Sequence, residues 1–107
     1  MSDVIAEVMS QKGTCVSGHK VGDKFIIGQQ TPPNFCSWAF HTLFPFAEVL
    51  QFGGSFPWEK DKDKTFVACP DPENPVVFEL RRCQTKHKIF VSGRVRLCLT
   101  SPSSKLQ

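Results

Sequence analysis

The chain has 107 residues, of which 40% are hydrophobic, including ten phenylalanines and two tryptophans. This composition can fill one compact core, and two separate domains are implausible. The sequence contains no run of about 18 uninterrupted apolar residues, so we expect no membrane-spanning helix and no membrane partner. The first residues lack the basic start and the apolar run of a secretory signal, which predicts a cytoplasmic protein.

The formal net charge of +3 conceals an uneven distribution along the chain. Residues 1–79 carry six lysines and all ten acidic residues, a formal charge of −4. Residues 80–107 carry seven lysines and arginines and no acidic residue, a formal charge of +7. Such a segment can fold over its own acidic domain, or it can bind an acidic partner or nucleic acid. No motif of nucleic-acid binding accompanies the charge, which favours the first interpretation.

The first third of the chain predicts two strands and a loop. Partial alternation of apolar residues over Val4–Met9 predicts the first strand, and Lys20–Ile27 predicts the second. The stretch before the second strand is rich in glycine, and Gly22 with Asp23 is a frequent start of a tight turn. The proline-containing stretch 28–34 then predicts a loop.

The stretch from Phe35 to Phe52 predicts the one helix, because its apolar residues recur near helical spacing. Pro45 has no amide hydrogen and crowds the preceding turn, so we expect either a kink there or two short helices. Gly53 and Gly54 follow as a helix end. The apolar face expected to pack on the sheet consists of Phe35, Trp38, Ala39, Leu43, Phe46, Ala47 and Leu50.

Four further strands are predicted in the second half of the chain. Thr65–Ala68 and Val76–Arg81 are expected to form an antiparallel pair across a connection that contains three prolines. Ile89–Val91 and Arg94–Leu99 predict a short terminal hairpin.

The order of these elements predicts an α+β fold, in which a small antiparallel sheet packs against one kinked helix. In chain order the fold reads β-β-α-β-β plus a C-terminal β hairpin. We expect residues 1–82 to form a single core domain. Residues 83–107 would form a basic C-terminal extension, a hairpin followed by a frayed end.

Three of the five cysteines lie at the edges of predicted elements, beside polar residues or glycines. They are Cys15, Cys36 and Cys69, whereas Cys83 and Cys98 lie in the extension and are interpreted as structural or incidental. An odd count without dense spacing argues against a disulfide framework. Because a thiolate at a helix start is stabilised by unpaired amides, Cys36 is the best candidate for a reactive thiol.

The same cysteines also suggest a metal site. Together with nearby histidines they would offer a soft set of sulfur and nitrogen ligands suited to zinc or another transition metal. The sequence contains no Cys-x2-Cys knuckle, so the spacing alone does not specify a zinc site. Burial of unreactive cysteines and ordinary hydrogen bonding by the histidines would explain the pattern equally well. The proposed metal or thiol site comprises Cys15, His19, Cys36, His41 and Cys69.

Three other residues are candidates for the surroundings of this site. Asp23 or Asp71 could orient a histidine that acts as a base toward a cysteine nucleophile. Trp58 could line a small-molecule pocket, because indole offers a large flat surface with one donor. Packing of the Trp58 loop onto the sheet, as a small second core, is the simpler interpretation of that residue.

The competing functional hypothesis is a noncatalytic binding module. A basic arm would then hold an acidic partner or nucleic acid, and the affinity would fall as salt rises. The terminal strands could also pair across a two-fold axis and form a homodimer. The residues expected in the binding arm are Arg81, Arg82, Lys86, Lys88, Arg94 and Arg96.

Four blocks of the sequence resemble a family of small bacterial and archaeal proteins of uncharacterised function. The blocks contain Gly18-His19-Lys20-Val21-Gly22-Asp23, Cys36-Ser37-Trp38-Ala39-Phe40-His41, Gly53-Gly54-Ser55-Phe56-Pro57-Trp58-Glu59 and Ala68-Cys69-Pro70-Asp71. The resemblance covers about residues 4 to 82 and includes the cysteines at 15, 36 and 69. Ser37 departs from the family pattern, where proline is expected after the cysteine. The resemblance supports the choice of site residues and implies no particular reaction.

Overall fold

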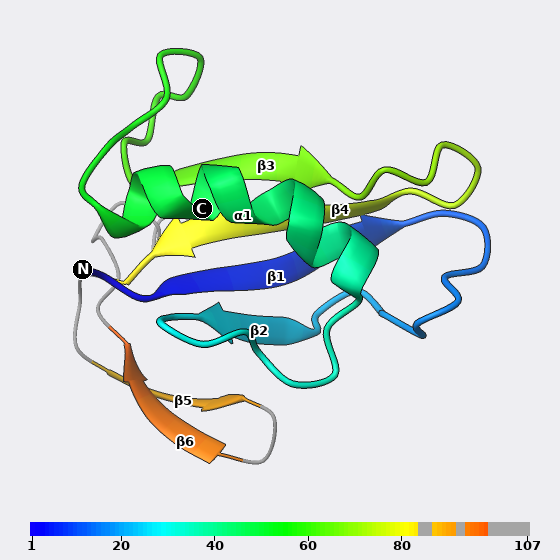
Figure 1. The fold of residues 1–107 in the computed structure, drawn as a ribbon, viewed down its shortest axis with the longest axis horizontal. Coiled ribbons are helices and arrows are strands. Elements are labelled where there is room, and N and C mark those ends of the chain that lie inside the picture. The colour runs from blue at the N-terminus through cyan, green and yellow to red at the C-terminus, as the bar shows by residue number, and fades with distance from the viewer. Residues whose placement is uncertain (84–86, 92–93, 99–107) are drawn as a thin grey trace.

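The computed structural model describes residues 1–83, 87–91 and 94–98. Its main sheet is antiparallel, with four strands in the order β2-β1-β4-β3. One helix, α1, lies across one face of this sheet (Figure 1). The bounds of these elements are β1 (Val4–Gln11), β2 (Lys24–Ile27), α1 (Ser37–Gln51), β3 (Lys64–Ala68) and β4 (Val76–Arg82). The predicted α+β fold is therefore confirmed.

A second, two-stranded antiparallel sheet follows the main one. It consists of β5 (His87–Val91) and β6 (Arg94–Cys98), and β5 lies near β2 (Figure 1). The two predicted terminal strands are thus confirmed as a pair. The frayed end expected after them lies outside the described residues, and so does Leu99.

Alternation along β1 explains how the sheet buries one face under the helix. Val4, Ala6 and Val8 are fully buried in the main core cluster, whereas Ile5 belongs to a separate cluster. Successive side chains of a strand point to opposite faces, so this split follows directly from the pleat. The register shifts after Val8, where an irregularity precedes Ser10.

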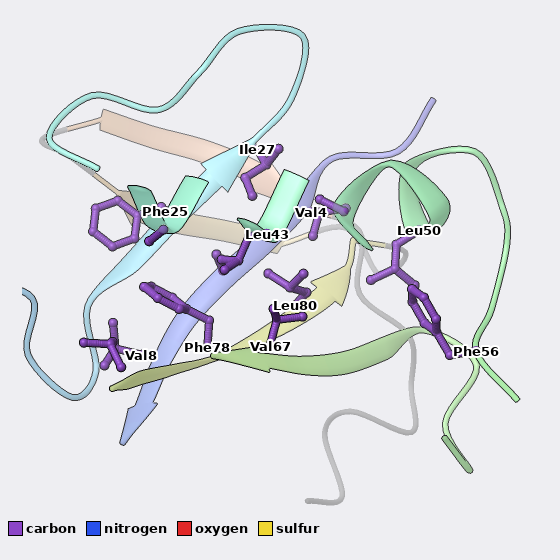
Figure 2. Packing of buried hydrophobic residues seen from close by; sticks show 14 residues of the cluster. Val4, Val8, Phe25, Ile27, Leu43, Leu50, Phe56, Val67, Phe78 and Leu80 are labelled. Atoms are coloured by element: carbon purple, nitrogen blue, oxygen red, sulfur yellow. The ribbon is translucent and has the colours of Figure 1, made fainter. Parts of the chain in front are cut away.

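The predicted apolar face packs on the core with the exception of Trp38, and Phe35 and Phe46 are partly buried against it. Ala39, Leu43, Ala47 and Leu50 are buried at helical spacing and pack against the strands (Figure 2). Burial of each leucine contributes about 1.5–3 kcal/mol. Trp38, which was expected on this face, is 58% exposed.

Pro45 lies inside a single continuous helix, so the alternative of two short helices is wrong. The packing of its apolar face on the sheet supports α1 on both sides of the proline. Within the described residues, no helix combines the length and apolar character needed to cross a bilayer.

Strand β2 begins four residues later than predicted. Asp23 accepts a hydrogen bond from the Lys20 amide at 2.9 Å, and its own amide donates to the Lys20 carbonyl at 3.0 Å. These bonds close a turn, so Lys20 and its neighbours belong to the β1–β2 loop. His19 therefore lies in a loop and not at the start of a strand.

Candidate functional site

Three segments that are distant in sequence meet at one end of the sheet. The β1–β2 loop, the β3–β4 loop and the start of α1 all lie at this end (Figure 1). The Thr14 amide donates a 2.8 Å hydrogen bond to the Asn74 side chain and so joins the two loops. The Cys36 amide donates a 3.1 Å hydrogen bond to His19 Nε2 and so joins the first loop to the helix.

His19 is a buried side chain surrounded by aromatic rings. It is only 5% exposed, and its ring centroid lies 5.1 Å from that of Phe25, 5.6 Å from Phe35 and 6.1 Å from Phe78. Burial lowers the pKa of His19 by disfavouring the charged ring, while the negative charge of Asp23 acts in the opposite direction. Since Nε2 accepts from an amide, the neutral ring carries its hydrogen on Nδ1.

Cys36 occupies the N-cap position of α1, which confirms its predicted place at the helix start. Partial burial raises the pKa of its thiol, but the Ser17 side chain and the backbone amides of Ala39 and Trp38 favour the thiolate. The net effect lowers the pKa. Among residues 1–83 Cys36 makes no side-chain capping hydrogen bond, so these amides act on the sulfur mainly as nearby dipoles.

The sequence did not identify Ser17 as a functional residue. It lies in the β1–β2 loop, 19 positions before Cys36, and a lone exposed serine beside a glycine is an ordinary loop feature. Only the approach of this loop to the helix start reveals the effect of the Ser17 side chain on the pKa of the Cys36 thiol. No signal in the sequence would have found it.

Cys69 and Cys15, the other two cysteines of the predicted site, make hydrogen bonds within their own loops. Cys69 Sγ accepts a 3.3 Å hydrogen bond from the Val76 amide, which closes the β3–β4 connection. Cys15 is partly buried against the core, and its carbonyl accepts from the Gly18 amide at 3.0 Å. Both are free thiols, as is Cys36. Cys83 is buried and disulfide-bonded, and the side chain of Cys98 lies outside the described residues.

His41 lies apart from the His19–Cys36 contact. It is exposed on α1 and lines a pocket together with Ser37 and Phe40, and Cys36 is not among the lining residues. In the part of the chain that the structure describes, no group of three or more His, Cys, Asp or Glu side chains is arranged to hold a metal ion. The structure thus brings together Cys36 and His19 from the predicted set, through the Cys36 backbone amide.

Asp23 and Asp71 organise the loops beside the site. Asp23 caps the turn that carries His19 and acts on that ring by its charge. Asp71 accepts hydrogen bonds from the amides of Glu73 and Asn74 and from the Asn74 side chain. The Asn74 side-chain and backbone bonds, with that from Glu73, lower the pKa of the Asp71 carboxyl. Asp71 thereby positions the Asn74 side chain that holds the Thr14 amide.

Trp58 lies far from Cys36. It follows the C-terminal end of α1, and a 15-residue helix is about 22 Å long. Its indole is 63% exposed, stacks near Phe56 with centroids 4.9 Å apart, and donates to the Thr65 hydroxyl at 3.2 Å. Phe56 belongs to the main core cluster and Trp58 is largely exposed, so this loop does not form the separate second core that was expected.

Two arginines of the expected binding arm are engaged within the domain. Arg82 is 6% exposed and donates to Asp63 and to the carbonyls of Leu50, Gly54 and Lys62. Arg81 pairs with Glu7 and Glu79 on the sheet. Lys86 lies outside the described residues, and so do the side chains of Lys88, Arg94 and Arg96.

Comparison of the chain with protein families, curated proteins and solved structures found no match. The resemblance carried by the four sequence blocks therefore stays an expectation.

Proposed function

We propose that the protein acts through a reactive thiol, with Cys36 as the nucleophile. The observation that carries this proposal is the position of the sulfur at the N-terminus of α1, where Ser17 and two backbone amides favour the thiolate over the thiol. The thiolate is the form of cysteine that attacks electrophiles and disulfides. A lowered pKa thus increases the reactive fraction at neutral pH.

His19 serves as a positioning residue in this proposal. Its Nε2 accepts a hydrogen bond from the Cys36 amide, whereas the Cys36 sulfur is influenced by Ser17 and the helix amides. The buried imidazole fixes where the helix starts relative to the β1–β2 loop, and the same loop carries Ser17. Loss of the His19 acceptor would therefore change the position of Ser17 and of the helix start around the Cys36 sulfur.

The chemistry available to this site is nucleophilic substitution at sulfur or carbon. With a disulfide substrate, the Cys36 thiolate would attack one sulfur, form a mixed disulfide and release the other sulfur as a thiolate. With an alkylating agent, it would form a thioether and expel the leaving group. A cytoplasmic location, which would keep Cys15, Cys36 and Cys69 reduced, remains part of this proposal, although disulfides such as that of Cys83 are rare in the cytoplasm.

Competitive labelling tests the proposal. The full chain is treated with less than one equivalent of iodoacetamide at pH 7, and peptide mass analysis then locates the label. We expect Cys36 to be labelled before Cys15 and Cys69, the other free thiols among the described side chains. Cys36→Ser should lose this fast reaction, whereas Cys15→Ser, the matched control, should retain it. Equal labelling of all three thiols would contradict the proposal.

Elemental analysis of the purified protein separates this function from metal binding. The reactive-thiol proposal predicts fast labelling of Cys36 without treatment with a chelator. Near-stoichiometric zinc or another transition metal, with thiols that react only after chelation, would contradict the reactive-thiol proposal and support a metal site. Cys36→Ser would then lose the metal.

A further inference from the structure

A pocket of about 560 Å³ lies between the β2–α1 loop and the first half of α1. Its volume falls within the range of about 300–1,000 Å³ that small-molecule sites occupy. The helix supplies Ser37, Phe40, His41, Phe44 and Pro45, whose spacing places them on one face. The loop supplies Thr31, Pro32 and Phe35.

Three phenylalanines form the apolar wall of this pocket. The ring centroids of Phe35 and Phe40 lie 6.0 Å apart with the rings nearly perpendicular, and those of Phe40 and Phe44 lie 5.3 Å apart and tilted. These separations lie in the 4.5–7 Å range in which aromatic rings attract one another, and a ligand ring can contact the phenylalanines in the same geometries. The wall thus suits a flat aromatic molecule.

One helix carbonyl among the residues that line the pocket lacks its regular helical donor. Pro45 has no amide hydrogen, so the carbonyl of His41 lacks the usual hydrogen bond from the residue four positions later. Both residues line the pocket. Ser37 and Thr31 add hydroxyl groups, and the lining contains no Lys, Arg, Asp or Glu. This chemistry favours an uncharged ligand that can donate a hydrogen bond.

We propose that this pocket binds a small uncharged aromatic molecule that carries an N–H or O–H donor, such as an indole or a phenol. The ring lies against the phenylalanine wall, and the donor reaches the His41 carbonyl. This binding site is additional to the reactive thiol and does not depend on it, because Cys36 does not line the pocket.

Titration of the ¹⁵N-labelled full chain with indole tests the proposal. Saturable shifts are expected at the amides of Thr31, Ser37 and Phe44. 1-Methylindole, which has the same ring and no donor, should bind the same amides roughly 3- to 10-fold more weakly because one hydrogen bond is missing. Shifts centred on the exposed Trp38 or Trp58, or no saturable shifts, would overturn the proposed site.

Pro45→Ala provides the matched protein variant. It restores an amide that can bond to the His41 carbonyl, and alanine favours a helix interior, so the variant should fold. We expect its affinity for indole to fall to that for 1-methylindole. Pro57→Ala, at an exposed proline beyond the helix, should leave both affinities unchanged. Equal affinities of the two probes in the unmodified chain, or an indole preference that survives Pro45→Ala, would overturn the role of the His41 carbonyl.

Discussion

The two ends of α1 are held to the rest of the protein in different ways. At the C-terminal end, the buried guanidinium of Arg82 donates all five of its hydrogen bonds, two of them to the carbonyls of Leu50 and Gly54. At the N-terminal end, His19 accepts one hydrogen bond from the Cys36 amide, and the sulfur of Cys36 remains a free thiol. The hydrogen bonds of Arg82 thus hold the C-terminal end of α1 rigidly, whereas the N-terminal end retains groups that can react or bind.

Arg82→Met should produce the largest loss of stability. It would leave the Asp63 carboxylate and three carbonyls without the guanidinium in a buried site, and removal of one partner of a buried ion pair costs about 3–5 kcal/mol. Urea unfolding followed by circular dichroism would measure this loss.

Arg81→Met is the control for Arg82, because Arg81 pairs with Glu7 and Glu79 on the sheet and donates to no helix carbonyl. Its cost should be smaller, about 1–3 kcal/mol, because the buried Glu79 keeps its ion pair with Lys64. Equal losses in the two variants would contradict the idea that the hydrogen bonds to helix carbonyls make Arg82 the more important arginine.

Gly13→Ala should have the next largest effect, at the opposite end of the sheet. Gly13 has a φ of +65°, and an added Cβ would collide with the Asn74 side chain and lie 3.1 Å from the Glu73 carbonyl oxygen. The left-handed backbone alone costs about 1–2 kcal/mol for a non-glycine residue.

Gly18→Ala separates the backbone cost from the collision, because Gly18 has a φ of +76° and open space around it. In thermal unfolding, the midpoint temperature of Gly13→Ala should be lower than that of Gly18→Ala. The opposite order would mean that the Asn74 contact contributes little to joining the two loops.

The smallest expected effect is a pH dependence caused by His19. The folded-state pKa of this buried ring lies below its ordinary value of 6.5, so the unfolded chain binds the proton first as pH falls. His19 therefore contributes full stability above about pH 6.5, and this contribution decreases as pH falls toward the lowered pKa.

The slope from one proton is at most about 1.4 kcal/mol per pH unit, and urea unfolding between pH 5 and 7 would detect it. His19→Gln should remove the slope, whereas His41→Gln, at an exposed histidine, should preserve it. A slope that is unchanged in His19→Gln would show that other groups cause it.

The fold was largely predictable because its strands and helix depend on local patterns. Partial alternation predicted β1, and helical spacing with a following glycine pair predicted α1. Where the prediction failed, tertiary contacts decided the outcome. The first helical turn lies near the end of the sheet, so Trp38 is exposed despite its apolar spacing. The turn closed by Asp23 removed Lys20 from β2.

The candidate site was predictable only in part. The helix start marked Cys36, since the N-cap position follows from local sequence. The residues that act on Cys36 lie far from it in the chain: His19 is 17 positions away and Ser17 is 19 positions away. A hydrophobic periodicity in the sequence does not predict contacts of this kind. Arg82 was assigned to a basic arm because its charge is visible in the sequence and its buried acceptors are not. The phenylalanine wall was missed because Phe40 and Phe44 lie beside the core face of the helix.

The pH dependence of Cys36 alkylation tests the central claim most directly. The rate of iodoacetamide labelling at Cys36 is measured by mass analysis between pH 5 and 10, with Cys15 in the same protein as the internal reference. We expect the Cys36 rate to reach half its maximum below the ordinary thiol pKa of about 8.5, and Ser17→Ala to move this midpoint upward. A Cys36 midpoint at or above the ordinary pKa, unaffected by Ser17→Ala, would contradict the assignment of Cys36 as a reactive thiol.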